Sequence, residues 1–428
     1  MARSARREPK KNPSSRRITV RIETIGSGGD GVARVGGDLF YTPLTAPGDL
    51  VTIDAAGDRG RLFEIVEKSP LRADPPCRHF GQCGGCALQH LSRDEELRWK
   101  RAQVERALHR AGVETEVRSA VAVPAASRRR ATFAARRAGN NLLLGFNERR
   151  SSRVVSIEDC AVLAPAFAAR LEGLKEIATL IPASEFDLAA TLCDNGLDLN
   201  ATDRKLSARA VLQAPGLAAA MRAGGAERLS VNGEIALALA EPTVSFDGVL
   251  VHPPPGAFLQ ASREGETALL DLVRTAVSGA RKIVDLFSGC GTFALPLARK
   301  ASVAAADSDG QAIDALKRAA AAAQRSGLQM NLLRAETRDL FERPLSAKDL
   351  KSYDAVIFDP PRAGAAAQAE EIAKSGVPVV AGVSCNPATF ARDASLLVAG
   401  GYRLIEVTPV DQFVYSPHVE LVGVFAKR

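Results

Sequence analysis

The chain has 428 residues, of which 46% are hydrophobic, so it can bury a large core and is expected to form two or three domains. It contains no apolar run near the roughly 18 residues that a membrane-spanning helix needs, and its first residues lack the apolar stretch of a secretion signal. Length, composition and charge therefore predict a cytoplasmic protein without a membrane partner.

The net charge of +7 is concentrated at the N-terminus, where residues 1–17 carry seven basic groups against the single acid Glu8. This segment has few apolar residues, so we predict a disordered basic tail of the kind that contacts RNA phosphates without sequence preference. An ordinary solvated tail is the alternative. The basic residues are Arg3, Arg6, Arg7, Lys10, Lys11, Arg16 and Arg17.

Residues 18–69 contain five short strand-like runs separated by Gly, Pro and Asp turn signals. Five strands within about fifty residues predict a small β-barrel like the OB-type modules that bind nucleic acids. Any other small β domain would have a similar pattern. The runs are ITVRIETI, GVARV, LFYT, LVTID and RLFEIVE.

The sequence pattern of residues 70–245 predicts a mixed α+β central domain. The domain begins with a cysteine-rich loop, DPPCRHFGQCGGCALQH. Cys77, Cys83 and Cys86 have the spacing C-x5-C-x2-C, and the seven cysteines of the chain, an odd number without a secretion signal, favour metal-binding or catalytic thiols. A tetrahedral sulfur site needs a fourth ligand, for which Cys160 is the best candidate. Zinc and an iron–sulfur cluster are both compatible with this ligand set.

A second basic cluster, SRRRATFAARR, lies further along the central domain and has Phe133 among its arginines. Arginines with an aromatic side chain suit phosphate pairing and base stacking. Contact with RNA and an ordinary solvated surface are two interpretations of this cluster that the sequence does not separate. The arginines are Arg128, Arg129, Arg130, Arg136 and Arg137.

From residue 246 onward, strand-like and helix-like segments alternate, which predicts an α/β fold with a doubly wound parallel sheet. The strand before DLFSGCGTF leads into a glycine turn with Gly289 and Gly291, and Asp307 ends the next strand. Glycines let the backbone approach a bound nucleotide, and the acid can hold ribose hydroxyls. The turn alone suits a nicotinamide dinucleotide or S-adenosylmethionine, and Asp285 favours the second.

Two later strands end in residues suited to chemistry. Asp359 follows a strand in YDAVIFDPPRAG, and Cys385 lies between a Val-rich strand and a helix in VPVVAGVSCNPATFARD. Asn386 is a good N-cap and Pro387 suits the first turn of a helix. A helix N-terminus favours the thiolate form of a nearby cysteine, although a buried structural cysteine remains the alternative.

Four segments, in this order, resemble the motifs of the bacterial RNA uridine-C5 methyltransferases, which use S-adenosylmethionine: DLFSGCGTF, FDPPRAG, SCNPATFARD and SPHVELVGVF. The resemblance extends over nearly the whole chain. It implies that residues 246–428 form a Rossmann-like class I methyltransferase domain. It also implies a TRAM module over residues 18–69 and a 4Fe-4S cluster in the central domain.

The resemblance assigns a role to each candidate residue. Cys385 is the nucleophile, Glu420 the general base, and Asp359 a contact to the cofactor or the uracil, while Arg362 is a candidate donor to uracil oxygen 4. The cofactor contacts implied are Gln260 in GAFLQAS, Phe287, Gly289, Thr292, Asp307, Glu336 and Asp359. The implied cluster ligands are Cys77, Cys83, Cys86 and Cys160, with zinc as the alternative metal.

The TRAM-like segment and the four cysteines together resemble the 23S rRNA members more than the tRNA members, so we expect 23S rRNA as the partner. We also expect a monomer without an obligate protein partner. Ser262, Thr292 and Asp307 depart from the residues common in the family, which leaves the detailed cofactor contacts open. Other functions remain as alternatives: a tRNA uridine-C5 methyltransferase, a noncatalytic RNA-binding or ribosome assembly factor, and a nucleotide-binding oxidoreductase.

Overall fold

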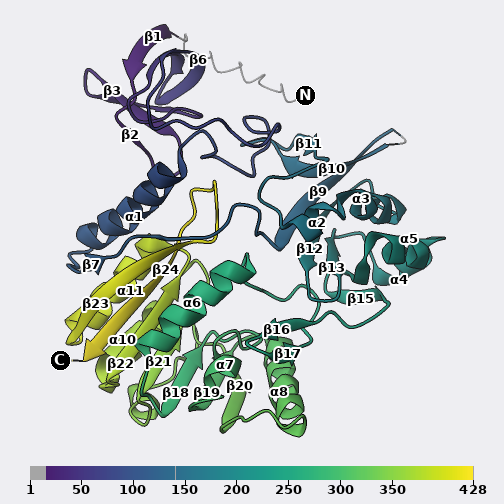
Figure 1. Cartoon of the computed structure of the whole chain (residues 1–428), viewed down its shortest axis with the longest axis vertical. Coiled ribbons are helices and arrows are strands. Elements are labelled where there is room, and N and C mark those ends of the chain that lie inside the picture. The colour runs from purple at the N-terminus through teal and green to yellow at the C-terminus, as the bar shows by residue number, and fades with distance from the viewer. Residues whose placement is uncertain (1–15, 140, 428) are drawn as a thin grey trace, which may run out of the picture. The chain divides into compact units, whose positions relative to one another are not determined.

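The computed structural model describes residues 16–139 and 141–427, which form two compact units (Figure 1). The first contains residues 16–81 and 86–96, and the second contains residues 82–85 and the described residues from 97 onward. Within these ranges, no helix has the length and apolar character needed to cross a membrane. Residues 1–15 of the predicted basic tail lie outside the described residues, whereas Arg16 and Arg17 already belong to the first strand.

The first unit is built on a six-stranded sheet with the strand order β1-β5-β6-β4-β3-β2. The first predicted strand divides into β1 and β2, because Ile22 donates its N–H to Asp49 O and accepts from the N–H of Gly48 instead of pairing along one strand. A separate apolar core, which includes Phe40 and Ile53, lies within the sheet. The strands are β1 (Arg16–Arg21), β2 (Thr24–Ile25), β3 (Gly31–Val35), β4 (Asp38–Thr42), β5 (Leu50–Ala56) and β6 (Arg59–Glu67).

The second unit contains a seven-stranded, mostly antiparallel sheet with the order β11-β10-β9-β12-β13-β14-β15, and Figure 1 shows helices α3, α4 and α5 beside it. Apolar residues of strands and helices form one core, in which Phe133 is fully buried. The elements are β9 (Arg130–Ala138), β10 (Asn141–Asn147), β11 (Val154–Ser156), α2 (Pro165–Ala168), α3 (Leu171–Leu180), β12 (Glu185–Leu192), β13 (Leu197–Thr202), α4 (Ala208–Leu212), α5 (Leu217–Gly224), β14 (Ala226–Val231) and β15 (Glu234–Ala238).

The C-terminal part confirms the predicted doubly wound α/β fold. Strands β18 to β22 are parallel, and β24 and β23 continue the sheet in the order β20-β19-β18-β21-β22-β24-β23-β7. The elements are α6 (Arg263–Ala276), β18 (Lys282–Leu286), α7 (Ala294–Leu297), β19 (Ser302–Asp307), α8 (Gly310–Arg325), β20 (Leu333–Thr337), α9 (Ala347–Leu350), β21 (Ala355–Phe358), α10 (Ala366–Ser375), β22 (Val379–Ser384), α11 (Pro387–Ala399), β23 (Tyr402–Asp411) and β24 (Glu420–Lys427).

Short segments connect the two sheets of the second unit. Strands β7 (Glu116–Val117) and β8 (Val121–Ala122) precede the seven-stranded sheet in sequence, yet both pair with β23. The range 70–245 therefore contributes to the C-terminal sheet as well, which the sequence did not predict. A two-stranded hairpin, β16 (Val244–Phe246) and β17 (Val249–Val251), packs on α8, and helix α1 (Arg93–Arg110) follows the cysteine-rich loop.

Two buried ion pairs join distant segments of the second unit. Arg129 pairs with Glu266 of α6 and donates through Nε to Gln260 O at 3.0 Å. Lys100 of α1 pairs with Asp411 and donates to Phe413 O at 2.9 Å. Removing one partner of a buried pair leaves an uncompensated charge, so both pairs hold the loop between β23 and β24 and the residues before α6 in place.

Two glycines on neighbouring strands make room for an aromatic ring that positions α11. Gly382 of β22 and Gly423 of β24 are directly opposite in the antiparallel register. A Cβ on Gly423 would lie 2.3 Å from Cζ of Phe390, and a Cβ on Gly382 would lie 3.3 Å from Cε2 of the same ring. Phe390 of α11 is fully buried there, so α11 and the residue before it are held close to the sheet.

We expect Gly423→Ala to lower the free energy of unfolding of the second unit by about 1–3 kcal/mol, the range for overpacking a core. Unfolding by denaturant can be followed by the fluorescence of Trp99, the single tryptophan of the chain. Gly310→Ala at the start of α8 is the matched control, because its Cβ would meet the nearest atom at an ordinary 3.4 Å. Equal stability of the two variants would contradict the role given to Gly423.

Candidate active site

Three candidate residues meet at the carboxyl edge of the parallel strands. Asp359 follows β21, Cys385 follows β22, and Glu420 begins β24. Ser384 pairs with Leu421 in the antiparallel register of β22 and β24, so Cys385 and Glu420 occupy the next opposed positions. Glu420 is buried, whereas Cys385 and Asp359 are partly exposed. Strand pairing thus places a thiol and a carboxyl group at one ligand-binding edge.

The backbone on both sides of Cys385 is held by hydrogen bonds. Asn386 is the N-cap of α11, as predicted, and its Oδ1 accepts from the N–H of Ala388 at 3.1 Å. Asn386 Nδ2 donates to Arg362 O at 3.1 Å, and the hydroxyl of Ser384 accepts from the N–H of Asn386 at 3.2 Å. Cys385 is therefore presented by a fixed turn between a strand and a helix.

A chain of two buried amides connects the two carboxyl groups. Gln260 donates through Nε2 to Asp359 Oδ2 at 3.1 Å. Gln412 donates through Nε2 to Gln260 Oε1 and to Glu420 Oε2, both at 2.8 Å. Sequence analysis selected Gln260 but missed Gln412, which lies between strands in a segment without a pattern of its own.

Burial makes both carboxyl groups weaker acids than usual. It raises the pKa of Asp359 to about 7, against the hydrogen bond from Gln260. Burial and the nearby Asp359 raise the pKa of Glu420 well above its ordinary value, while the hydrogen bond from Gln412 lowers it. A carboxyl group with a raised pKa accepts a proton more readily than an ordinary carboxylate, which suits proton transfer.

In the free protein, the expected effect of the helix N-terminus on Cys385 is opposed by burial and by nearby carboxyl groups. Burial raises the pKa of the Cys385 thiol to about 11, and the charges of Glu420 and Asp359 raise it further than the Arg362 guanidinium lowers it. Arg362 is exposed, and its Nη2 lies 3.3 Å from Nδ1 of His418. Two carboxyl groups and desolvation therefore outweigh the helix dipole, whose effect is small.

The glycine turn after β18 has the backbone conformations of a ligand-binding loop. Phe287, Gly289 and Gly291 all have positive φ angles, of 63°, 50° and 94°. A Cβ on Gly291 would lie 3.0 Å from the side chains of Leu295 and Leu316, while a Cβ on Gly289 would meet no atom within 4 Å. Gly291 is thus required by packing, and Gly289 leaves the turn open to a ligand.

The surroundings of this turn fit a nucleoside-bearing cofactor. Asp307 accepts at Oδ2 from the N–H of Gly289 at 2.9 Å and at Oδ1 from the N–H of Asp309 at 2.8 Å, so its carboxylate is fixed at the end of β19. Asp285 is fully buried beside the backbone N–H of Ala294, and among the described residues the buried hydroxyl of Ser288 has no hydrogen-bond partner. Buried polar groups of this kind favour a ligand that brings donors or positive charge.

The remaining predicted cofactor residues differ in exposure. Thr292 is partly exposed within the turn, and Phe287 contacts Phe341 with the rings tilted by 55° and their centroids 5.5 Å apart. Glu336 is exposed on β20 and pairs with Arg338 at 3.3 Å. Ser262 is fully buried and caps α6 by accepting from the N–H of Gly265 at 3.0 Å, so its departure from the common family residue serves the helix.

The arginine cluster is mostly structural. Phe133 is buried in the core and stacks on Phe146, so it is not a base-stacking residue, and Arg129 is buried in its ion pair. Arg136 donates to Phe186 O, and Arg137 donates to Thr179 O and Ile181 O at the end of α3. The prediction of RNA contact is therefore wrong for Arg129 and Phe133.

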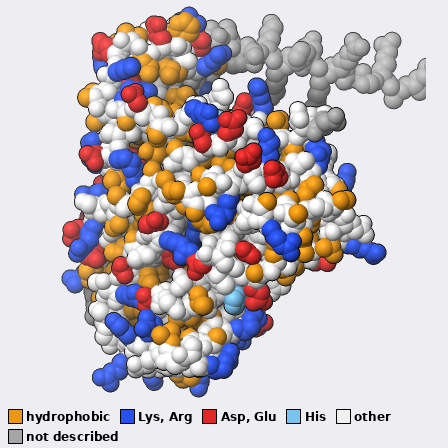
Figure 2. Space-filling view, turned by 45° about the vertical axis from the view of Figure 1, so that its right-hand side comes forward, with side chains coloured by type: hydrophobic (Ala, Val, Ile, Leu, Met, Phe, Trp, Pro, Cys, Tyr) orange, Lys and Arg blue, Asp and Glu red, His pale blue; other side chains and the backbone are white. Residues whose placement is uncertain are grey.

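Arg128 and Arg130 instead line a cavity of about 290 Å³ within the second unit. The Arg130 guanidinium lies 4.7 Å from the ring centroid of Phe258, and that of Arg128 lies 5.7 Å from the ring of Phe413. Phe258 is 67% exposed, two residues before Gln260. Over the face in Figure 2, Lys and Arg side chains are otherwise interspersed with Asp and Glu.

None of the seven cysteines is in a disulfide bond. Cys77 and Cys86 belong to the first unit, Cys83 and Cys160 to the second, and all four are partly exposed. Within the described ranges, no group of three or more His, Cys, Asp or Glu side chains has the arrangement of a metal site. Cys193 and Cys290 are buried, and burial raises the pKa of each to about 12.

We expect Glu420→Gln to speed alkylation of Cys385 by iodoacetamide at pH 9. The substitution removes a carboxylate that raises the pKa of Cys385, so the thiolate fraction increases roughly three- to tenfold, equal to about half to one pKa unit. Peptide mass spectrometry measures the rate at Cys385, with buried Cys290 as an internal standard. Glu406→Gln on β23 is the matched control, and equal rates in both variants would contradict the electrostatic account.

Known proteins resemble this chain over nearly its full length. Residues 251–428 match the family model described as tRNA (Uracil-5-)-methyltransferase. An uncharacterized RNA methyltransferase of Rhizobium meliloti is 45% identical over 424 residues, which cover 96% of this chain and 99% of that protein. The 23S rRNA (uracil(1939)-C(5))-methyltransferase RlmD of Pseudomonas entomophila is 32% identical over 432 residues, 96% of this chain and 94% of that protein.

A solved structure of a uracil-C5 methyltransferase is also similar to this chain. The crystal structure of the Pyrococcus abyssi tRNA (uracil-54, C5)-methyltransferase in complex with S-adenosyl-L-homocysteine aligns with a TM-score of 0.73 and 27% identity, covering 95% of this chain and 99% of that one. The fold, the site at the carboxyl edge and the relatives agree. The chain belongs to the family of S-adenosylmethionine-dependent RNA uracil-C5 methyltransferases.

Proposed function

We propose that the chain methylates carbon 5 of a uridine in 23S rRNA through a covalent bond between Cys385 and carbon 6 of the uracil. The observation that carries this proposal is the placement of Cys385 opposite Glu420, in a register that β22 and β24 determine. Carbon 5 of uracil is a weak nucleophile, and addition of a thiolate to carbon 6 gives an enolate that is reactive at carbon 5. A thiol and a base on the same site meet this need.

Cys385 performs the first step. Its Sγ bonds to carbon 6, and the thiol proton passes to the carboxylate of Asp359, which acts on Cys385, so that Glu420 stays ionised for the last step. S-adenosylmethionine, when bound, supplies the methyl group as an electrophile for carbon 5. Arg362, which lowers the pKa of Cys385, is the candidate donor to uracil oxygen 4, where the negative charge of the enolate develops.

Glu420 performs the last step as the general base. Its carboxylate takes the proton from carbon 5, the carbon–hydrogen electron pair forms the double bond to carbon 6, and the carbon–sulfur bond breaks with its electrons returning to Sγ. The raised pKa of Glu420 suits it to accept this proton near neutral pH. Asp359 and Gln260, joined by a hydrogen bond of 3.1 Å, are proposed to contact the cofactor or the uracil.

The turn after β18 is the proposed cofactor site. Asp307 and Glu336 end adjacent strands and would hold ribose hydroxyls or face the adenine, while Phe287, Gly289 and Thr292 would contact the nucleoside and the amino-acid group. The open side of Gly289 and, among the described residues, the unpaired hydroxyl of Ser288 support this assignment.

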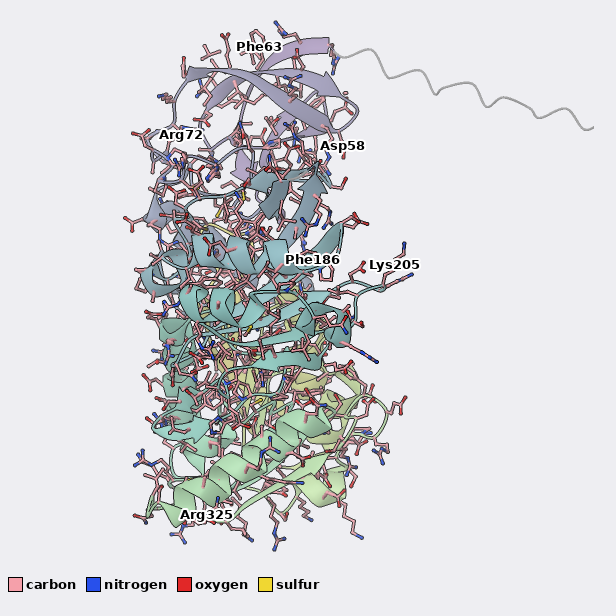
Figure 3. The ribbon with its side chains drawn as sticks, turned by 90° about the vertical axis from the view of Figure 1, so that its right-hand side faces the viewer. Asp58, Phe63, Arg72, Phe186, Lys205 and Arg325 are labelled. Atoms are coloured by element: carbon pink, nitrogen blue, oxygen red, sulfur yellow. The ribbon has the colours of Figure 1, made fainter. Side chains whose placement is uncertain are left out.

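RNA binding is supported by two separate surfaces. In the second unit, the cavity beside Gln260 offers exposed Phe258 next to Arg130, a pairing that suits base stacking and phosphate contact. In the first unit, Phe63 of β6, which is labelled in Figure 3, is 53% exposed. The guanidinium of Arg17 lies 3.6 Å from its ring centroid. We propose that the first unit is the TRAM-like RNA-binding module.

We propose that Cys77, Cys83, Cys86 and Cys160 hold a 4Fe-4S cluster, with zinc as the alternative. Their C-x5-C-x2-C spacing and the absence of any disulfide among the seven cysteines support this assignment. Such a cluster would stabilise the folded chain, because the free energy of binding the cluster adds to the free energy of folding.

The choice of RNA can be tested with unmodified substrates. We expect methyl transfer to carbon 5 of uridine in 23S rRNA from cells that lack the enzyme, and loss of at least about a thousandfold in Cys385→Ala, because no other thiol can form the adduct. Cys193→Ala, which removes a buried thiol remote from the reaction, should remain active. Methylation of tRNA alone would favour the tRNA alternative, and RNA binding without methyl transfer would favour a noncatalytic factor.

The metal can be tested by elemental analysis of protein purified without oxygen. We expect iron and acid-labile sulfide, with the broad visible absorption of an iron–sulfur cluster, in the wild type and loss of both in Cys83→Ser. Cys193→Ser is the matched control. Stoichiometric zinc without iron would establish the alternative metal, and neither metal would contradict the ligand assignment.

A further inference from the structure

The side chain of Gln412 lies between Gln260 and Glu420 and donates a hydrogen bond to each. We propose that Gln412 is a positioning residue that holds Glu420 ready to accept the uracil proton, by one hydrogen bond to Oε2 that leaves Oε1 directed to carbon 5. This inference rests on the function proposed above. It assigns a role to a residue in the loop between β23 and β24 that lies outside the motifs of the sequence.

The orientation of the Gln412 amide is determined by its neighbours. The N–H of Ala261 can only donate, and it lies 3.1 Å from Oε1 of Gln412. The oxygen of the amide must therefore face Ala261, and the NH₂ group must face the other way. Its two protons then go to Glu420 Oε2 and Gln260 Oε1, both at 2.8 Å.

This orientation extends to the next amide. Because Gln260 Oε1 accepts from Gln412, its Nε2 is directed to Asp359 Oδ2 at 3.1 Å. Gln412 therefore sets the direction of every hydrogen bond between the two carboxyl groups. Among the described residues, Glu420 has no further hydrogen-bond partner, so its Oε1 is available for proton transfer.

The surrounding structure is built to hold Gln412 in this place. The side chain is only 2% exposed, and its neighbours in sequence, Asp411 and Phe413, both bond to buried Lys100. Gly265 of α6 leaves the space that the side chain needs. A Cβ on Gly265 would lie 2.6 Å from Cβ of Gln412 and 3.0 Å from its Oε1.

The hydrogen bond from Gln412 also changes the pKa of Glu420. Burial and Asp359 raise the pKa of Glu420, and Gln412 lowers it by stabilising the ionised form. Cys385 follows β22 and lies near Glu420, and Arg362 acts on that thiol. His418 lies beside Arg362, and the buried pair of Lys100 and Asp411 adjoins Gln412. Without Gln412, a larger fraction of Glu420 is protonated at a given pH and cannot act as a base.

The step affected is the release of the methylated base. Glu420 must take the carbon-5 proton before the carbon–sulfur bond can break, so a protonated or misdirected Glu420 leaves the methylated uracil bound to Cys385. Formation of that adduct does not require the Glu420 base. The loss of Gln412 should therefore separate the two halves of the reaction.

The test is a single-turnover experiment with Gln412→Met, which keeps the length of the side chain and removes its hydrogen bonds. With ordinary uridine RNA, we expect a denaturant-stable, methylated protein–RNA adduct to accumulate and to resolve roughly tenfold or more slowly. We also expect the pH at which resolution reaches half its maximum to rise by roughly one unit, because the variant raises the pKa of Glu420. Gln368→Met, which removes a buried amide bonded to Leu345, is the control for loss of packing.

Gly265→Ala provides a second variant, since it displaces Gln412 without changing its chemistry, and it should shift the pH profile in the same direction. Resolution at the wild-type rate with an unchanged pH profile in both variants would overturn the role of Gln412. The absence of any adduct or methylated uridine with the wild-type protein would instead overturn the proposed function, so the two failures are distinguishable.

Discussion

The antiparallel pairing of β24 with β22 is the interaction on which the site depends. It brings a residue from the end of the chain, Glu420, opposite the turn that presents Cys385, and the two glycines under Phe390 allow α11 to pack close to both strands. The parallel strands supply the cofactor turn and Asp359 at the same edge. A single sheet edge thus carries the proposed nucleophile, the proposed base and the proposed cofactor turn.

In the free protein, burial at this edge disfavours the ionised forms of Cys385, Asp359 and Glu420. A thiol with a pKa of about 11 and two carboxyl groups with raised pKa values lie together, and the charges of the two carboxylates raise the pKa of the thiol. Two buried amides connect the carboxyl groups without adding charge. In the proposed reaction, Arg362 stabilises the negative charge that develops on the enolate.

Much of this arrangement could be predicted from local sequence signals. The N-cap Asn386 and the helix that begins at Pro387 follow from propensity and capping, and they are confirmed. Exposure could not be predicted: Arg129 and Phe133 look like RNA contacts in sequence, but alternation along β9 directs Phe133 into the core and Glu266 of α6 pairs with Arg129. Gln412 and strands β7 and β8 were missed because only tertiary contacts define them.

The most direct test of the covalent mechanism uses RNA in which 5-fluorouridine replaces uridine. A fluorine on carbon 5 cannot be removed as a proton, so attack by Cys385 should leave a stable adduct once the methyl group is transferred. We predict that mass spectrometry of the digested adduct finds methylated fluorouridine attached to the peptide that contains Cys385, and that Cys385→Ala forms none. Methyl transfer to ordinary uridine RNA without any adduct on the fluorinated RNA would contradict the account.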